Sequence, residues 1–462
     1  MTIHDMSAGE LLAAYRSKKL SPVEAVDAVI TRIERWEPKL KALYAPDFGN
    51  ARRLAQESER RWQASRPQGA LDGVPITIKE NIATKGVPVP LGTAATELTP
   101  ASADAPAAAR VREAGAIILA KTTMPDYGML SSGRSSFHPL TRNPWNLAWN
   151  PGGSSAGAGA AAAAGYGPLH LGTDIGGSVR LPASWNAIFA LKPSLGRVPV
   201  DPPFFGRVVG PMARTVGDAA LLMAEVAKSD TRDHMSLPKA EIDWMADPLE
   251  PKGLKIALHL DAGSGLPVDP EVKQAIEKAA NLFAGAGAIV EPLEGFLSPE
   301  MLHLQDLFWR VRSWVDFSAL SHAKKANVLP FIADWCRGGA DVSGAMVIRG
   351  VNNYMAIRAA TTRATEPFDF VLSPTSPVPT FAAEWETPTN DVNRPLEHIS
   401  FTMPYNMSEQ PAASINCGFT REGKAIGLQI AGHRFNDLGV LRLSRWFEQA
   451  RGPQKAWPEP PV

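Results

Sequence analysis

The sequence predicts an α/β fold built around a large, mostly parallel β-sheet. Two observations indicate this fold: short β-branched runs alternate with helical patterns from Gly73 onward, and 45% of the 462 residues are hydrophobic. The runs 74–78 and 116–120 flank a helical pattern at 104–114, which is the strand-helix-strand order of a parallel sheet. A chain of this length and composition can bury one large core or two moderate ones.

The N-terminal part of the chain is predicted to be helical. Ser7 and Glu10 have the spacing of a capping box, in which each side chain bonds the backbone of the other residue. Ser21 and Glu24 repeat this spacing further along. We therefore expect two or three helices before the first strand of the sheet.

Changes of pattern divide the chain into four expected parts. A helical segment packs on the core, a second part forms the core with the catalytic residues, a variable insertion or smaller subdomain shapes the substrate pocket, and the last part returns to the sheet. The boundaries are expected at residues 1–70, 71–230, 231–370 and 371–462. A second strand-helix-strand unit and a further strand are predicted at 254–260, 270–286, 288–293 and 370–372.

Charge and cysteine content argue against several functions. The 47 basic and 47 acidic residues give a formal charge of zero, so no field of one sign exists to attract nucleic acid or anionic lipid. Cys336 and Cys417 have no neighbours at zinc-ligand spacing, and neither a disulfide framework nor a metal site is expected. Because no apolar run approaches about 18 residues and no signal peptide is evident, we expect a cytoplasmic protein without a membrane partner.

Three polar segments stand out against apolar surroundings, at residues 76–80, 151–155 and 173–180. Taken alone, each has a plain explanation: Lys79 could be a solvated lysine at a strand end, and the glycine pairs could be ordinary turns. Together they supply the parts of an acyl-transfer site. A serine is a weak nucleophile until a base removes its proton. A lysine can be that base only if burial or cationic neighbours lower its pKa from about 10.4 toward about 7 to 8.

The segment GGSSAGAGAAAAAGYGPLHLGTDIGGSVRLPA, residues 152–183, resembles the defining serine- and glycine-rich stretch of the amidase signature enzymes. By composition alone, its glycine and alanine run would suit a flexible linker or a tightly packed helix. The resemblance implies that family's fold, a large mixed, mostly parallel central sheet covered by helices on both faces. Further similar stretches are found at 71–79, 114–116, 121–123, 143–145, 210–213, 401–402, 406, 411–412 and 427–429.

The resemblance also implies a catalytic triad. Ser178 would be the nucleophile, Ser154 the relay that follows a cis peptide bond, and Lys79 the base. The implied reaction is the hydrolysis of a non-peptide carboxamide bond in a small molecule through an acyl-enzyme. No cofactor and no metal are implied.

Further roles are implied for residues around this triad. Glycines before the nucleophile let the backbone approach a substrate closely, and main-chain donors in this loop would form an oxyanion hole. The implied oxyanion donors are the N–H groups of Ile175, Gly176, Gly177 and Ser178. The implied supporting residues are Ser155, Asp174 and Arg180, and the implied pocket residues are Met129, Leu130 and Thr173.

Four residues have open interpretations. Glu409 stands where a small residue is common in the family, so its carboxylate could reach the substrate and favour a cationic amide, or it could be solvated in a loop. Trp309, Trp314 and Trp335 could wall a pocket or could be structural.

Two rival functions remain open. The catalytic subunit of a glutamine-dependent transfer RNA amidotransferase has the same resemblance, but such subunits commonly carry threonine where this chain has Ile175. A catalytically silent binding homologue is the second rival, although all three triad positions are filled. The sequence leaves the oligomeric state open, and a homodimer is compatible with it.

Overall fold

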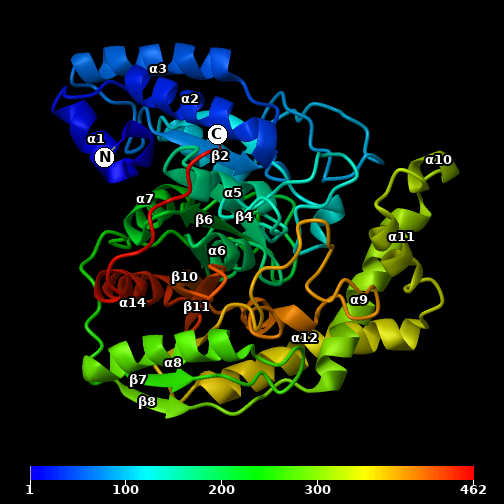
Figure 1. Ribbon diagram of the computed structural model, residues 1–462. Coiled ribbons are helices and arrows are strands. Elements are labelled where there is room, and N and C mark those ends of the chain that lie inside the picture. Colours follow the sequence, from blue (N-terminus) through cyan, green and yellow to red (C-terminus); the bar gives the residue numbers. More distant parts are fainter. Residues whose placement is uncertain (1, 462) are drawn as a thin grey trace.

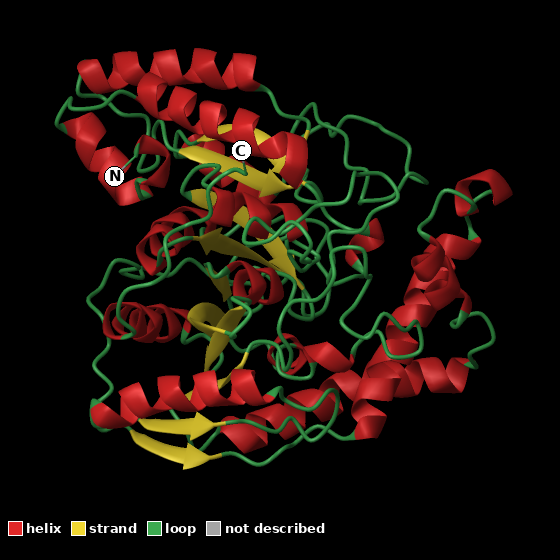
Figure 2. Cartoon of the chain, in the orientation of Figure 1, coloured by secondary structure: helices red, strands yellow, loops and turns green. Residues whose placement is uncertain are grey.

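The computed structural model describes residues 2–461 and contains one 11-stranded sheet with helices packed around it (Figures 1 and 2). The strand order is β1-β3-β2-β4-β6-β5-β10-β11-β9-β7-β8. The strands are β1 (Leu43–Tyr44), β2 (Pro75–Lys79), β3 (Ile117–Thr122), β4 (Leu169–Asp174), β5 (Phe189–Lys192), β6 (Val208–Ala213), β7 (Lys255–Leu258), β8 (Ile289–Pro292), β9 (Phe370–Pro374), β10 (Ala412–Phe419) and β11 (Ala425–Gly432).

The helices alternate with the strands along much of the chain. The α-helices are α1 (Ala8–Arg16), α2 (Pro22–Leu40), α3 (Phe48–Gln63), α4 (Pro106–Glu113), α5 (Ala156–Ala164), α6 (Arg180–Asn186), α7 (Val216–Val226), α8 (Pro270–Gly285), α9 (Pro299–Ser318), α10 (His322–Lys325), α11 (Pro330–Arg337), α12 (Gly344–Thr365), α13 (Met403–Met407) and α14 (Asp437–Ala450). Short 3-10 helices are η1 (Ile3–Asp5), η2 (Asp126–Gly128) and η3 (Glu397–Ile399).

The sheet is mixed, as expected, but parallel pairing is not its main feature. The parallel pairs among residues 2–461 are β2 with β3 and β4, and β7 with β8 and β9; the other neighbours pair antiparallel. The sequence pattern revealed the two strand-helix-strand units, which form parallel pairs. It did not reveal the centre of the sheet, where β10 and β11 form a hairpin and β5 and β6 run antiparallel to their neighbours. The expectation of a mostly parallel sheet is therefore wrong.

Both faces of the sheet are buried under helices, which the side chains of β3 show directly. Ile118 packs into the core cluster that includes residues of α4, α7, α8 and α14. Ile117 and Leu119 point to the opposite face, into a cluster with residues of α2, α3 and α5. The expected helix layers on both faces are therefore confirmed. The two predicted capping boxes, at the starts of α1 and α2, are also present.

The glycine- and alanine-rich segment forms a helix rather than a linker. All nine residues of α5 are buried. A side chain at Gly157 would lie 2.2 Å from the carbonyl oxygen of Ala42 and 2.5 Å from the backbone nitrogen of Thr123, so larger residues would push this helix off the sheet. The small residues thus bring the start of α5, and with it Ser154 and Ser155, close to the ends of β2 and β4.

A group of helices from the third part of the chain extends away from the sheet. Helices α9 and α12 pack along each other, and α11 packs on α9; in Figure 1 these yellow and green helices lie at the lower right. Strands β7 and β8 of the same part join the edge of the main sheet. Within residues 2–461, no helix combines the length and the hydrophobicity that crossing a bilayer requires.

Candidate active site

Lys79 is the last residue of β2, and its side chain is fully buried. Because β2 and β4 are parallel neighbours with Ile78 opposite Leu171, the end of β2 lies beside the end of β4. The Lys79 amine donates a hydrogen bond of 2.7 Å to Ser154 Oγ and one of 3.0 Å to Thr173 Oγ1. The structure therefore joins two of the three predicted triad residues directly.

The environment of Lys79 favours the neutral amine. Burial lowers the pKa of Lys79 to about 7, and the positive charge of Arg207 acts in the same direction. The carboxylates of Asp174 and Glu80 oppose this shift without cancelling it. Since a free lysine has a pKa of about 10.4, the buried amine can accept a proton near neutral pH.

Ser154 and Ser155 connect this amine with the loop after β4. The peptide bond between Gly153 and Ser154 is cis, as the resemblance implies. Ser155 Oγ bonds the backbone of Thr173, donating to its carbonyl at 3.2 Å and accepting from its N–H at 3.3 Å. Ser155 thus holds the residue that contacts Lys79 and, among residues 2–461, makes no hydrogen bond to Lys79 itself.

Ser178 lies in the loop between β4 and α6 and is half-buried. Its carbonyl accepts a hydrogen bond of 3.2 Å from the N–H of Ser155, which ties the two serine segments together. Among the described residues, no hydrogen bond joins the hydroxyls of Ser178 and Ser154. Ser178 instead lines a cavity of about 50 Å³, where its hydroxyl can meet a substrate.

The four predicted oxyanion donors differ in availability. The N–H of Gly177 donates to Asp174 Oδ1 at 2.9 Å, so it is not free to bind a substrate oxygen, and its predicted role is corrected. The N–H groups of Ile175, Gly176 and Ser178 have no acceptor among residues 2–461. The Asp174 carboxylate folds over the turn that follows its own strand. It accepts hydrogen bonds from two N–H groups of this turn, that of Gly177 and, at 3.0 Å, that of Val179.

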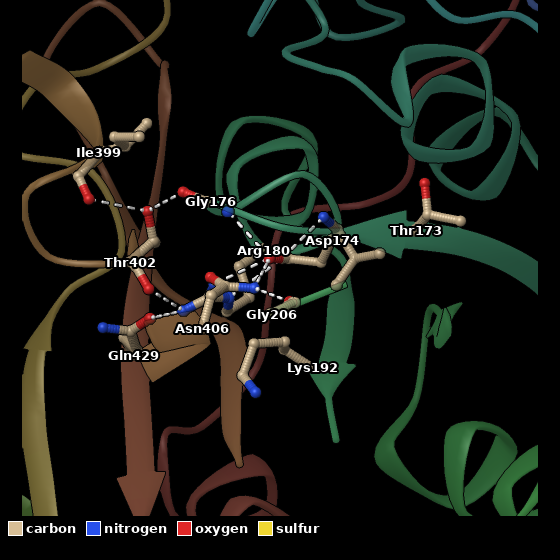
Figure 3. A network of polar contacts seen from close by, with 12 residues as sticks. Thr173, Asp174, Gly176, Arg180, Lys192, Gly206, Ile399, Thr402, Asn406 and Gln429 are labelled. Atoms are coloured by element: carbon tan, nitrogen blue, oxygen red, sulfur yellow. Dashed lines mark hydrogen bonds and ion pairs between the residues drawn. The ribbon is translucent and has the colours of Figure 1, made fainter. Parts of the chain in front are cut away.

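Asp174 and Arg180 form the centre of a buried polar network (Figure 3). Arg180 donates to both carboxylate oxygens of Asp174, at 3.1 and 2.9 Å. Its remaining donors reach the Thr402 carbonyl, Gln429 Oε1 and Asn406 Oδ1, at 2.8, 2.8 and 2.6 Å. Burial alone would raise the pKa of Asp174, but the charge of Arg180 and these hydrogen bonds hold it well below its ordinary value. This pair orients the loop and does not act as a proton carrier.

The network also fixes the backbone at Gly176. Thr402 Oγ1 donates to the Gly176 carbonyl at 2.6 Å, as Figure 3 shows. A side chain at Gly176 would come within 3.2 Å of both Trp309 and Ile399, so these side chains cover the loop closely. Sequence similarity marked Thr402 and Asn406, but their role became visible only through their contacts.

Two cavities meet at this site. The smaller is lined by Met129, Leu130 and Trp309 beside Ser178. The larger, about 380 Å³, is lined by Thr173. The three predicted pocket residues therefore line the site, although Leu130 is also part of the core. Met129 and Arg312 line both cavities, and Asn81 and Arg207 line the larger one. Sequence reasoning missed Asn81, Arg207 and Arg312.

Contacts in the structure resolve the open interpretations of Glu409 and the insertion tryptophans. Glu409 pairs with Arg358 at 3.0 Å and Arg434 at 2.6 Å and lines neither cavity. Trp309 lines the smaller cavity. Trp335 is buried in the insertion core, where its ring nitrogen donates to Asp306 at 2.8 Å, and Trp314 packs at the edge of the same cluster.

The described part of the chain offers no ready metal centre. Residues 2–461 contain no group of three or more histidine, cysteine, aspartate or glutamate side chains placed to hold a metal ion.

Comparison with known proteins gives the family. Residues 24–441 match the Amidase family. The chain is 34% identical to an acylamidase of Rhodococcus erythropolis over 97% of this chain and 96% of that protein. It is 33% identical to a Glutamyl-tRNA(Gln) amidotransferase subunit from Myxococcus xanthus over 97% and 98% of the two chains. The solved structure of a bacterial aryl acylamidase of the amidase signature family superposes with a TM-score of 0.90, at 31% identity over 97% and 96%.

These similarities extend over nearly the whole chain and include the segments that form the site described above. The large central sheet with its helices is likewise shared with the solved aryl acylamidase. The chain therefore belongs to the amidase signature family and is an amide-hydrolysing enzyme.

Proposed function

We propose that this enzyme hydrolyses the C–N bond of a small-molecule carboxamide through an acyl-enzyme on Ser178, with Ser154 as proton relay and Lys79 as base. The observation that carries the proposal is the 2.7 Å hydrogen bond from the buried Lys79 amine to Ser154 Oγ. A lysine held beside a serine hydroxyl, with burial lowering its pKa to about 7, has the property that a general base needs.

The proposed reaction begins with two linked proton transfers. Neutral Lys79 accepts the Ser154 proton while Ser154 Oγ accepts the Ser178 proton, and Ser178 Oγ bonds the amide carbon. The carbonyl oxygen becomes an oxyanion, for which the free N–H groups of Ile175, Gly176 and Ser178 are suitable donors. Removing one such donor typically costs about 2.7 to 4 kcal/mol of transition-state stabilisation.

The second half of the reaction reverses these transfers. Ser154 gives its proton to the departing nitrogen as the C–N bond breaks, and Lys79 returns a proton to Ser154. Water then attacks the acyl carbon and passes a proton to the same relay. The bond between Ser178 Oγ and the acyl carbon breaks, the relay returns the proton to Ser178 Oγ, and the carboxylic acid leaves. The names of the acylamidase and aryl acylamidase relatives support an acylated amine as the substrate type.

Replacing the nucleophile tests this proposal. Ser178→Ala should lower turnover of every amide in a panel of acylated amines to background, because no acyl-enzyme can form. Amine release is the readout, and labelling by a fluorophosphonate probe followed by peptide mass spectrometry locates the modified serine. Thermal unfolding of the variant checks that the fold is intact. Wild-type turnover retained by Ser178→Ala would contradict the assignment of the nucleophile.

A second candidate is a glutamine-hydrolysing subunit of a transfer RNA amidotransferase. The observation that favours it is the 33% identity to the Myxococcus xanthus amidotransferase subunit over nearly the full length of both chains. Ammonia release from glutamine separates the two functions. The free-standing amidase should hydrolyse acylated amines by itself, whereas glutaminase activity that arises only when partner subunits are added would favour the amidotransferase.

A further inference from the structure

Two arginines line the larger cavity without an acidic partner in the described part of the chain. Arg207 directly precedes β6, and Arg312 lies in α9. Among residues 2–461, neither guanidinium has a carboxylate oxygen within 4.0 Å. Arg310, in the same helix as Arg312, contacts Asp306 at 2.6 Å, and Arg180 contacts Asp174 at 2.9 Å. The Arg207 guanidinium donates a hydrogen bond of 3.3 Å to the Pro202 carbonyl. Its charge, like that of Arg312, has no ion-pair partner among residues 2–461.

Both guanidiniums lie against the same aromatic ring, that of Phe204. The Arg312 guanidinium carbon lies 3.9 Å from the centre of the Phe204 ring, and that of Arg207 lies 5.5 Å from the same centre. Burial and the charge of Arg312 lower the pKa of Arg207 to about 10, so both groups stay protonated at neutral pH. Two half-buried positive charges against the same ring repel each other, and an anion bound in this cavity would relieve this repulsion.

Both arginines line the larger cavity, and Arg312 also borders the smaller one. Thr173, which accepts a hydrogen bond from Lys79, lines the larger cavity. Ser178 and Gly176 line the smaller one. In the proposed mechanism the departing nitrogen faces the relay that ends at Lys79, so the amine part of a substrate extends into the larger cavity and the acyl part into the smaller.

Acidic residues also line the larger cavity, but they are more exposed than the arginines. The side chains of Asp201 and Asp316 are exposed, whereas Arg207 and Arg312 are half-buried. Asp316 follows Arg312 by one helical turn without pairing with it. The charge of Asp316 opposes the lowering of the Arg312 pKa, but the arginines are the less exposed charged groups in this cavity.

We propose that the amine part of the substrate carries a carboxylate or a similar anionic group, which Arg207 and Arg312 bind. This inference rests on the proposed function and deepens it by naming a substrate class: the N-acyl derivatives of amino acids, aminobenzoates and related anionic amines.

Matched substrates test the proposal on the wild-type enzyme. The probes are para- and meta-acetamidobenzoate, with acetanilide and para-acetamidotoluene as neutral counterparts of similar shape. We expect kcat/KM for the better acetamidobenzoate to exceed that of the neutral anilides by about tenfold or more, since a hydrogen-bonded charge pair typically contributes that much. Equal values of kcat/KM for charged and neutral anilides would overturn the proposal.

Variants then assign the preference to the two arginines. Arg207→Gln and Arg312→Gln should each reduce the ratio of kcat/KM for the anionic to the neutral anilide by about tenfold. Arg312→Lys should keep part of the ratio because it keeps the charge. Asp316→Asn should increase the ratio, since it removes a negative charge from the same cavity. Arg363→Gln is the matched control, because Arg363 is exposed on α12 and lines neither cavity.

Failure of this inference and failure of the proposed function give different results. If neutral anilides are hydrolysed through Ser178 and the charged ones have no advantage, the substrate class is wrong while the amidase mechanism stands. If no amide of either kind is hydrolysed and Ser178 cannot be labelled, the proposed function fails. An anionic preference that persists in both glutamine variants would remove Arg207 and Arg312 from the binding site.

Discussion

Two neighbouring strands each carry a buried lysine near their end, and only one of these lysines contacts a serine. Lys79 ends β2, and Lys121 lies on β3 opposite Ile78. Burial lowers the pKa of both lysines to about 7. The Lys79 amine donates to Ser154, whereas the Lys121 amine donates to the Ile82 carbonyl and to Thr84 Oγ1.

This difference shows that a lowered pKa is not sufficient evidence of catalysis. Lys192, on β5, is also buried with a pKa lowered to about 7, and its amine bonds only the carbonyl of Pro193 among residues 2–461. Desolvation acts on any lysine enclosed by this sheet. Lys79 differs in the identity of its hydroxyl partner: Ser154 adjoins Ser155, whose N–H bonds the Ser178 carbonyl, whereas the Thr84 hydroxyl beside Lys121 lines neither cavity. A neutral amine becomes a useful base only when the proton to be taken belongs to a group near the reacting bond.

The largest effect is expected from exchanging the two strand-end lysines separately for methionine. Lys79→Met should reduce kcat/KM for an acylated amine by on the order of 10³-fold or more, because the relay loses its base. Lys121→Met should keep kcat/KM within about threefold while lowering the free energy of unfolding by about 1 to 3 kcal/mol, since the buried Ile82 carbonyl loses its donor. Steady-state kinetics and denaturant unfolding of both variants measure these effects. Similar losses of kcat/KM in the two variants would contradict the conclusion that only Lys79 acts as the base.

An intermediate effect is expected from pH. The base must be neutral, so kcat/KM should reach a plateau above the Lys79 pKa of about 7 and fall about tenfold per pH unit below it, or about 100-fold at pH 5. Asp174 stays ionised over this range because its pKa is held far below the ordinary value. Lys121→Met should leave the midpoint of the profile unchanged. A flat profile between pH 5 and pH 9 would rule out Lys79 as the titrating base.

The smallest effect is expected from the threonine that each lysine contacts. Thr173→Val removes a 3.0 Å hydrogen bond to Lys79 and should reduce kcat/KM by about five- to tenfold, the value of one hydrogen bond. It should also move the midpoint of the pH profile downward, because the lost bond stabilises the protonated amine. Thr84→Val, beside Lys121, should change kcat/KM by less than about twofold. A larger loss in Thr84→Val than in Thr173→Val would contradict the assigned roles.

Local sequence pattern predicted much of the fold. The runs 74–78 and 116–120 correspond to β2 and β3, and both N-terminal capping boxes formed. The pattern did not indicate that β5 and β10 pair, with Leu191 opposite Ala413. Such a pairing joins segments that are far apart in sequence, and it depends on tertiary packing rather than on local preference. The sequence pattern therefore underestimates the share of antiparallel strand pairs.

The candidate site likewise has features that the sequence predicts and features that it does not. The types and order of Lys79, Ser154 and Ser178 in the sequence indicate acyl transfer. Whether a particular N–H is free could not be predicted, because Gly177 is engaged by a carboxylate that also serves Arg180. The unpaired state of an arginine is equally invisible in a sequence, since it depends on every acidic side chain in the folded protein.

The contacts of Arg180 with Thr402, Asn406 and Gln429 determine when, during synthesis of the chain, the Ser178 loop can be held in place. The loop that carries Ser178 is complete early in translation, but the groups that hold it are made more than two hundred positions later. A nascent chain that ends before Thr402 lacks the hydroxyl that bonds the Gly176 carbonyl. The loop around Ser178 can therefore gain its full set of contacts only after most of the chain has been synthesised.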